Sequence, residues 1–179
     1  MKDFKNFNKV DPFALKENVF DMLQDEWMLI TAGDIDNFNT MTAAWGSFGI
    51  LWRKPIAVIY IRPQRFTFEF TENFNTFSLS FFGHNNYREA LSFCGTKSGR
   101  DYDKVKETGL TPITTPNQNV AFEEARLVID CRKLYADFIK PELFFDVALE
   151  QSIYPSSDHH RFYIGEILGC YERKNYKHL

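Results

Sequence analysis

The sequence predicts a mainly β protein, an antiparallel barrel with short helices at its periphery. Three observations lead to this fold class. The predicted strands outnumber the predicted helices, and most connections between strands are too short for the crossovers that parallel strands need. Aromatic residues make up 17% of the chain, including 19 Phe, and aromatic residues are frequent in β-rich structure. An antiparallel barrel is therefore favoured over a doubly wound sheet.

The first elements are a helix and a hairpin. Asp11 followed by Pro12 is typical of a helix start, and apolar residues recur up to Leu23, so we expect a short helix over residues 11–23. Residues 27–32 (WMLITA) form a predicted strand. The turn GDIDNFN, rich in Gly, Asp and Asn, then returns the chain into the next strand.

Two further strands are predicted over residues 41–51 and 56–61. The second, IAVIYI, is continuously apolar, which indicates burial on both faces. Residues 66–73 follow as a helical turn. In residues 76–82, apolar positions alternate with serines, which predicts a strand with one core face and one polar face.

The second half of the chain predicts two short helices and two long strands. Residues 87–94 and 101–108 are helical candidates around the polar loop GTKSGRD, and Gly109 ends the second helix. Residues 121–134 and 162–171 are predicted antiparallel strands. Residues 141–157 are ambiguous and are consistent with a short helix over 143–150 followed by a loop.

Composition limits the function classes. A chain of 179 residues with 44% apolar content can form one substantial core, so we expect a single domain over residues 1–179. A net charge of −3 argues against a nucleic-acid partner. The chain has neither a signal-like N-terminus nor an apolar run near the ~20 residues of a membrane span. We expect a cytoplasmic protein without a membrane partner, with Cys94, Cys131 and Cys170 as reduced thiols.

Several common catalytic motifs are missing from the sequence. It contains no GxGxxG, GxxxxGK[ST], HExxH or GxSxG pattern, which argues against Rossmann, P-loop, zincin and α/β-hydrolase chemistry. His159 and His160 are neighbours, and adjacent side chains of an extended chain point to opposite faces. Asp158 has no convincing partner for metal binding. We therefore expect no metal site.

Two arginines and a threonine lie at the end of the predicted buried strand. Arg62, Arg65 and Thr67 bring two cations and a hydroxyl within six residues. Arginine binds phosphate oxygens in a bidentate manner, and a hydroxyl with turn amides can complete such a site. Spacing alone leaves an alternative open, in which both arginines lie at the surface and pair with Glu69 or Glu72.

Two other segments could contact a ligand. The segment NTMTAAWG (residues 39–46) is rich in small residues, which allow a ligand to approach the backbone closely. The loop TKSGRDYD (residues 96–103) could close over an anion, although such loops are also common as solvated connectors.

Five segments in order, NTMTAAWG, IRPQR, SLSFF, CGTKSGRDYDK and HHRFYIGEIL, resemble the flavoredoxin-like branch of the flavin reductase family. The resemblance spans about residues 27–171. It implies an FMN-binding split β-barrel with antiparallel, Greek-key-like strands, in a homodimer with the flavin near the subunit interface. It also implies hydride transfer from NADH or NADPH to flavin N5, followed by electron transfer to a small-molecule or protein acceptor.

The resemblance also implies roles for individual residues. The isoalloxazine edge would be followed by Met41, Thr42, Ala43 and Ala44, with Trp45 shaping the pocket or the dimer seam. The phosphate and ribityl chain would be held by Arg62 and Arg65, supported by Gln64 and Thr67. Ser80, Phe81 and Phe82 would line the flavin, and further phosphate-side contacts are assigned to Lys97, Ser98 and Arg100. The candidate catalytic residue, on the nicotinamide or substrate side, is His160, for which the alternative is an exposed histidine entering a strand.

Two departures from the family pattern shift the expected contacts. Phe66 stands where a tyrosine is more frequent, and Ala44 replaces a frequent serine, so backbone N–H groups would supply more of the binding. Flavin chemistry needs an anchored phosphate and a stabilised reduced ring rather than an acid–base dyad. Two other functions stay open: an electron carrier with little reductase turnover, and a non-enzymatic binding barrel that has lost the cofactor.

Overall fold

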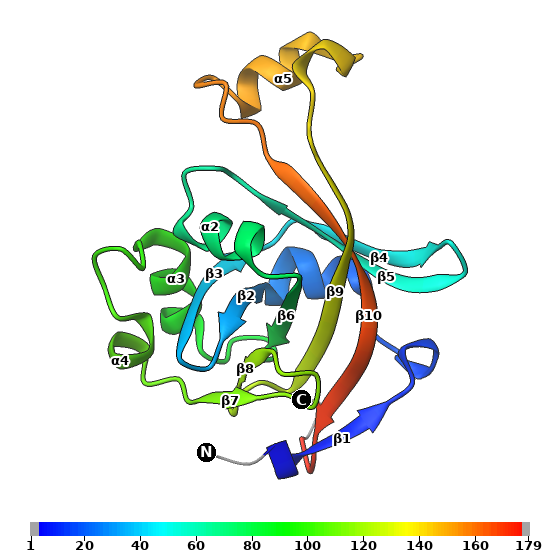
Figure 1. Cartoon of the computed structure of the whole chain (residues 1–179), viewed down its shortest axis with the longest axis vertical. Coiled ribbons are helices and arrows are strands. Elements are labelled where there is room, and N and C mark those ends of the chain that lie inside the picture. Colours follow the sequence, from blue (N-terminus) through cyan, green and yellow to red (C-terminus); the bar gives the residue numbers. More distant parts are fainter. Residues whose placement is uncertain (1–3, 177–179) are drawn as a thin grey trace.

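The computed structural model describes residues 4–176, so residues 1–3 and 177–179 of the predicted domain lie outside the described residues. Its centre is an antiparallel eight-stranded sheet in the order β3-β2-β6-β9-β10-β5-β4, with β1 also paired to β10 (Figure 1). The sheet curls into a split barrel, which confirms the predicted mainly β fold. Its strands are β1 (Phe7–Val10), β2 (Met28–Asp34), β3 (Asn37–Ala43), β4 (Gly46–Leu51), β5 (Lys54–Ile61), β6 (Thr76–Phe81), β9 (Leu127–Phe138) and β10 (Arg161–Arg173).

Helices and a small hairpin lie at the periphery. One side of the barrel carries α2 (Phe66–Asn73), α3 (Arg88–Thr96) and α4 (Lys104–Thr108), whereas α5 (Val147–Ile153) lies on a segment that projects away from the barrel between β9 and β10 (Figure 1). A two-stranded sheet pairs β7 (Pro112–Thr114) with β8 (Val120–Phe122). Short turns complete the described chain: η1 (Phe4–Asn6), η2 (Pro12–Ala14), α1 (Val19–Asp21), the π-helical η3 (Met22–Glu26) and η4 (Pro141–Leu143).

The core is divided between the two faces of the sheet because neighbouring strand residues point in opposite directions. On β2, Ile30 packs with Ile59 and Phe77 inside the barrel, whereas Leu29 packs on the other face with Leu91 of α3. All are at most 1% exposed, and full burial of such a side chain stabilises by about 1.5–3 kcal/mol. The outer face of β2 is thus covered as well.

Several predicted elements are confirmed. The strand over 27–32 is β2, residues 66–73 form α2, and residues 162–171 lie within β10. Gly109 ends α4 in the left-handed conformation, with φ 69°. Close packing requires glycine at position 165 of β10, because a Cβ there would lie 2.6 Å from the ring of Phe77.

Three predicted elements are interrupted. The helix predicted over 11–23 is wrong: Asp11 caps η2 and Asn18 caps a separate turn, α1. The strand predicted over 41–51 is two strands, because the chain leaves β3 after Ala43 and enters β4 at Gly46. The strand predicted over 121–134 is divided into β8 and β9 by a turn in which Ala125 N–H bonds the Phe122 carbonyl.

Burial and helix position also differ from expectation. The run IAVIYI is not buried on both faces, because Ala57, Ile59 and Ile61 are fully buried whereas Val58 and Tyr60 are partly exposed. The helix predicted over 143–150 begins later, as α5 (Val147–Ile153), because the Asp146 side chain caps its start by accepting the Leu149 N–H.

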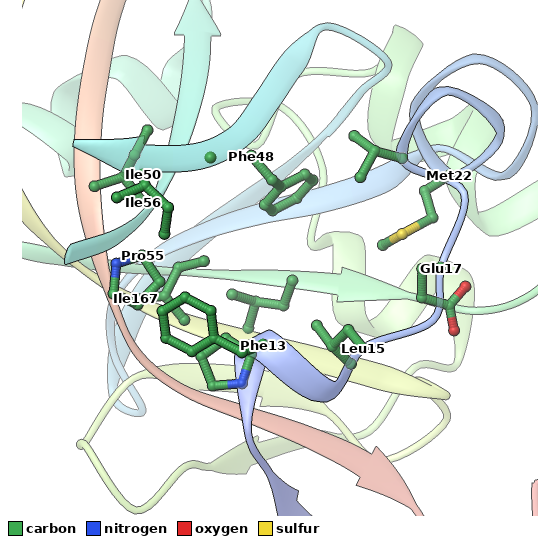
Figure 2. A pocket seen from close by; sticks show the side chains of 13 residues that line it. Phe13, Leu15, Glu17, Met22, Phe48, Ile50, Pro55, Ile56 and Ile167 are labelled. Atoms are coloured by element: carbon green, nitrogen blue, oxygen red, sulfur yellow. The ribbon is translucent and has the colours of Figure 1, made fainter. Parts of the chain in front are cut away.

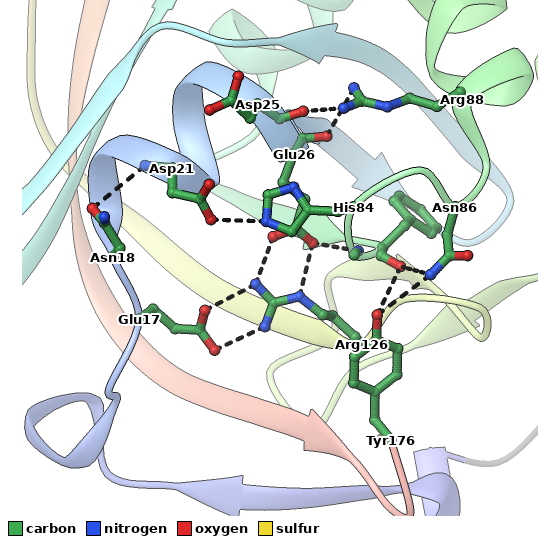
Figure 3. A network of polar contacts seen from close by, with 12 residues as sticks. Glu17, Asn18, Asp21, Asp25, Glu26, His84, Asn86, Arg88, Arg126 and Tyr176 are labelled. Carbon is green, nitrogen blue, oxygen red and sulfur yellow. Dashed lines mark hydrogen bonds and ion pairs between the residues drawn. The ribbon is translucent and has the colours of Figure 1, made fainter. Parts of the chain in front are cut away.

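A buried ion network joins the N-terminal segment to the barrel (Figure 3). The Arg126 guanidinium contacts Glu17 at 2.8 and 3.0 Å and Glu26 at 2.8 and 2.5 Å. Glu26 is fully buried and also accepts the backbone N–H of Gly83. Buried charges are tolerated when each has partners, so this network fixes η3 against the start of β9.

Candidate functional site

Two small cavities contain most of the predicted site residues. The first, which we call the ring cavity, has a volume of about 180 Å³ and lies where the chain passes from β3 to β4. It is lined by Met41, Thr42, Ala43, Ala44, Trp45, Tyr60 and His160. Six of these seven residues were predicted, and Tyr60 was not.

His160 is held firmly in the wall of the ring cavity. Its Nδ1 lies 2.9 Å from the Tyr154 hydroxyl, and its ring centroid is 5.1 Å from that of Trp45. His160 is 7% exposed, so the alternative of an exposed histidine is wrong. Burial, with a smaller contribution from the charge of Arg62, lowers the pKa of His160 to about 4. The imidazole is therefore neutral at pH 7 and can offer one N–H donor.

The second cavity, which we call the phosphate cavity, has a volume of about 190 Å³. It lies between the start of α2 and the loop that follows α3. The predicted residues Gln64, Arg65, Thr67, Lys97 and Ser98 line it, together with Phe66, Thr96, Gly99 and Lys104. The polar loop TKSGRDYD and the segment after β5 are thus brought together, as a phosphate site would require.

Two cations of the phosphate cavity, the buried Lys104 and the half-buried Arg65, lack acidic partners. Lys104 is 7% exposed, and its Nζ donates to the carbonyl oxygens of Thr40 at 2.8 Å and Cys94 at 2.9 Å. Arg65 donates to the same Cys94 carbonyl at 3.4 Å. Neither cation forms an ion pair with any residue in 4–176. Burial of an unpaired charge is costly, so the charges that line this cavity are suited to an anion.

Burial shifts the titration of both cations. Burial lowers the pKa of Arg65. It also lowers the pKa of Lys104 to about 8; the electrostatic effect of Cys94 opposes this shift, and the positive charge of Arg65 adds to it. A bound anion would favour the ammonium form of Lys104 and raise this pKa.

Two segments of the chain connect the walls of the two cavities. On one side, the chain passes from Tyr60 in the ring cavity to Gln64 in the phosphate cavity, a reach of at most about 14 Å. On the other side, the Thr42 hydroxyl donates to the Leu91 carbonyl of α3, whose end supplies Thr96 to the phosphate cavity. One elongated ligand could therefore contact both cavities.

Arg62 lies away from the phosphate cavity. Its guanidinium pairs with Asp158, donates to the Ile153 carbonyl at 3.0 Å, and stacks 5.3 Å from the centroid of the Tyr154 ring. Arg62 therefore anchors the projecting segment near His160. The alternative in which Arg62 and Arg65 pair with Glu69 or Glu72 does not occur within residues 4–176, because these carboxylates pair with Arg100 and Arg161.

Four further predicted residues line neither cavity. Arg100 lies at the rim, where it donates to the Gln64 carbonyl at 3.3 Å and stacks 4.7 Å from the centroid of Phe66. Ser80, Phe81 and Phe82 are buried in the core. The Ser80 hydroxyl has no hydrogen-bond partner within the described chain.

Lys104 and Tyr60 are the site residues that sequence reasoning missed. Lys104 follows Asp103, the cap of α4, and nothing in its local sequence distinguishes it from a solvated helix lysine. Tyr60 could have been found, since period-two alternation on β5 puts it on the face opposite Ile59 and Ile61.

A separate, largely apolar cavity of about 260 Å³ lies between the N-terminal segment and the β4–β5 hairpin (Figure 2). Phe13, Leu15, Phe48 and Ile50 line it, and Glu17 is its one ionisable side chain. Within residues 4–176, no three His, Cys, Asp or Glu side chains are grouped to bind a metal ion. The helices of the same range are all too short or too polar to cross a bilayer.

Comparison with known proteins identifies relatives of the chain. The family model described as flavin reductase like domain matches residues 23–179. No curated protein matches the sequence.

Solved structures share the fold at low sequence identity. An FMN-binding domain of a flavin reductases-like enzyme from Shewanella baltica aligns with a TM-score of 0.67 and 16% identity, over 94% of this chain and 78% of that one. Flavoredoxin from Methanosarcina acetivorans aligns with a TM-score of 0.65 and 19% identity, over 94% of this chain and 78% of that one. Flavoredoxin of Desulfovibrio vulgaris aligns with a TM-score of 0.63 and 20% identity, over 84% of this chain and 70% of that one.

Proposed function

This chain belongs to the flavin reductase like family, and we propose that it binds FMN and acts as an NAD(P)H-dependent oxidoreductase. The observation that carries the proposal is a pair of cations, the half-buried Arg65 and the buried Lys104, that line the phosphate cavity without an acidic partner among residues 4–176. A phosphate dianion would supply the missing negative charge through charge-assisted hydrogen bonds. The names of the solved neighbours, FMN-binding proteins and flavoredoxins, support this choice of anion.

The residues of the two cavities fit the two ends of FMN. Arg65, Lys104 and the Ser98 hydroxyl would hold the phosphate, and Gly99 allows its backbone to approach because no Cβ is present. Residues 41–45 would lie along the isoalloxazine, with Thr42 on the side of α3. FMN would supply the redox chemistry, which is the acceptance of hydride from NADH or NADPH and the release of electrons to a small-molecule or protein acceptor.

The protein's own contribution is to hold neutral donors around the ring. The Tyr154 hydroxyl can donate to His160 Nδ1, and that arrangement leaves the proton of the neutral imidazole on Nε2. His160 with Trp45 and Tyr60 would then offer an uncharged, partly aromatic surface to the nicotinamide or the acceptor. No paired catalytic carboxylate is needed for this role.

We also propose a homodimer in the cytoplasm. The projecting segment exposes Leu143, Phe145, Val147 and Leu149, with Phe145 fully exposed, and large exposed apolar patches mark interaction surfaces. Each of the two cavities is smaller than the roughly 300 Å³ of ordinary ligand pockets, so a second copy would complete the site. The three cysteines are buried and unpaired, as a reducing compartment favours.

Comparison of FMN with riboflavin tests the proposal, because the two ligands differ only by the phosphate. We expect the free protein to bind FMN more tightly, and Arg65→Ala to weaken FMN by about tenfold or more while leaving riboflavin unchanged. Arg62→Ala is the matched control, since it removes an equal charge three residues away and should leave the FMN-to-riboflavin ratio unchanged. A protein that binds no FMN, or an Arg65→Ala variant with an unaltered ratio, would refute the proposed site.

Anaerobic mixing of the FMN-loaded protein with NADH or NADPH then separates the two flavin functions. Rapid bleaching of the flavin absorbance is expected for a reductase. Bound FMN that neither nucleotide bleaches would favour the electron carrier.

A further inference from the structure

The end of the projecting segment is fastened to the barrel by two side chains that follow β5. The Arg62 guanidinium pairs with the Asp158 carboxylate, and the Gln64 amide donates through Nε2 to the same carboxylate oxygen at 2.5 Å. We call these three side chains the anchor. Arg62 also donates to the Ile153 carbonyl at 3.0 Å, at the end of α5. These contacts hold the part of the chain that leads directly to His160 and β10 (Figure 1).

Tyr154 connects the anchor to His160. The Arg62 guanidinium lies 5.3 Å from the centroid of the Tyr154 ring, and the centroid of the His159 ring lies 4.4 Å from it. Tyr154 is 5% exposed, and its hydroxyl lies 2.9 Å from His160 Nδ1. The Nδ1 edge of His160 therefore faces Tyr154, which does not line the ring cavity, and the opposite Nε2 edge is left for the cavity.

The contact between Tyr154 and His160 determines which imidazole nitrogen carries the proton. If Nδ1 donated to Tyr154, the phenol proton would be left unsatisfied, because no other acceptor contacts the Tyr154 hydroxyl within residues 4–176. If the phenol donates, its proton and the Nδ1 lone pair are both satisfied, and unsatisfied buried groups are costly. Burial raises the pKa of Tyr154, which keeps the phenol protonated. His160 therefore carries its proton on Nε2.

A second neutral donor lies in the same cavity. The Tyr60 hydroxyl forms no hydrogen bond within the described part of the chain, and neither does His160 Nε2. The charge of Arg62 is balanced by Asp158, and neither of these two residues lines the cavity. The ring cavity thus offers one N–H and one O–H donor without a charged wall. Such a pair suits the oxygen of a neutral carbonyl group, which has two lone pairs.

We propose that Arg62 and Tyr154 are positioning residues for His160, which together with Tyr60 holds the carbonyl oxygen of a molecule that meets the flavin ring. This inference rests on the proposed function. Arg62 acts through Asp158 and Tyr154 and lines neither cavity. Two molecules carry a suitable carbonyl: NADH or NADPH, in the carboxamide of its nicotinamide, and an electron acceptor of the quinone class. A quinone would take up the two electrons and two protons that reduced FMN releases.

Nitrogen NMR of the free protein tests the positioning without FMN. The ¹⁵N shifts of an imidazole distinguish a protonated from an unprotonated ring nitrogen, and His160→Gln assigns the signals. At pH 7 we expect the proton on Nε2 in the wild-type protein and a mixture of tautomers in Tyr154→Phe, which lacks the donor. A proton on Nδ1 in the wild type, or an unchanged tautomer in Tyr154→Phe, would overturn the inference.

Arg62→Met tests the anchor. Loss of the contacts to Asp158 and to the Tyr154 ring should release the Tyr154 hydroxyl and again give a mixture of tautomers. Arg132→Met is the matched control, because Arg132 also forms an ion pair, with Glu166 on β10, but lines neither cavity. An Arg62→Met variant that keeps the wild-type tautomer, as the control should, would contradict the role of Arg62.

Anaerobic stopped-flow kinetics of the FMN-loaded protein identify the carbonyl. If it is the carboxamide, Tyr154→Phe should slow flavin reduction by NADH or NADPH about tenfold and leave reoxidation by p-benzoquinone unchanged. If it is the quinone, the reoxidation should be the slower step and the reduction should be unchanged. A variant in which both rates stay within about twofold of the wild type would overturn the inference. A protein that binds no FMN would refute the proposed function and the carbonyl ligand with it, whereas the NMR result would still stand.

Discussion

At the scale of single residues, the site depends on groups whose protonation is shifted by burial. Lys104 and His160 are both 7% exposed, and burial favours the neutral form of each. The surroundings of the two residues differ, because Lys104 faces a cavity suited to an anion whereas His160 faces aromatic rings. A bound anion should therefore keep Lys104 charged up to a higher pH and leave His160 neutral.

FMN affinity should decrease as the pH rises through about 8. The Lys104 ammonium titrates at a pKa of about 8 in the free protein, and bound phosphate would raise that pKa. Affinity therefore falls by up to about tenfold per pH unit between the two pKa values. Fluorescence titration from pH 7 to 9 measures the dependence, with riboflavin and the Lys104→Met variant as controls that should show none. A flat FMN profile would contradict the placement of Lys104 beside the phosphate.

The stability of the protein should fall as the solution is acidified from pH 7 to 5. The folded pKa of His160, about 4, lies below its ordinary value of 6.5, so the unfolded chain binds the proton first. The stability is fully present above about pH 6.5 and is lost as the pH falls toward 4, by about 2 kcal/mol between pH 7 and 5. Urea denaturation of the protein and of His160→Gln isolates this contribution. An equal pH dependence in both proteins would argue against it.

At the scale of elements, the ion network in Figure 3 joins segments that the sequence separates by about a hundred residues. Arg126 at the start of β9 holds Glu26 of η3 and Glu17 before α1. Since η3 leads directly into β2 through Trp27, whose φ is 67°, the network also sets where β2 begins. The ring cavity depends on this placement because β3 pairs with β2 in register.

Arg126→Met should destabilise the protein strongly, because it leaves the Glu26 carboxylate buried without its cation. We expect a loss of about 3–5 kcal/mol in the free energy of unfolding. Glu17→Gln should cost much less, since the Glu17 side chain is 19% exposed and Arg126 keeps Glu26 as a partner. Urea denaturation compares the two variants, and equal losses would show that Glu26 is not the group that depends on Arg126.

At the scale of the whole molecule, two unpartnered apolar regions stand out. The projecting segment between β9 and β10 carries exposed side chains at its far end, and Phe13 and Ile50 are exposed beside the apolar cavity of Figure 2. The ring cavity lies near the base of the projecting segment, because His160 ends that segment directly before β10. The exposed apolar side chains make this segment the surface through which we expect a second copy to associate.

Sedimentation velocity should show a dimer that the double variant Phe145→Asp, Leu149→Asp dissociates. Two charges in an apolar interface would weaken association by about tenfold or more. Phe20→Asp is the control, since Phe20 is 85% exposed but lies on α1, outside the segment. A monomeric wild-type protein, or a double variant that associates as the wild type does, would refute this interface.

The local sequence was enough to predict elements whose signals are short-range. The alternation of SLSFF identified β6, and Gly109 marked the end of α4. Errors arose where the chain turns within a regular pattern, and the signal for the turn was missed or lay far away in the sequence. The chain leaves β3 after Ala43 and enters β4 at Gly46, where a Cβ would lie 2.9 Å from the Val58 carbonyl oxygen. No residue nearby in the sequence indicates that contact.

By itself, the sequence determined the split-barrel class and the order of the segments that form the site, because strand periodicity and motif order are properties of the chain. Only the tertiary structure decided which cations share a cavity. Arg62 and Arg65 are equivalent by spacing, yet Arg62 pairs with Asp158 whereas Arg65 lies beside the buried Lys104. Burial and charge pairing depend on residues that are distant in sequence, so only the fold distinguishes Arg65 as the arginine that we propose for the phosphate.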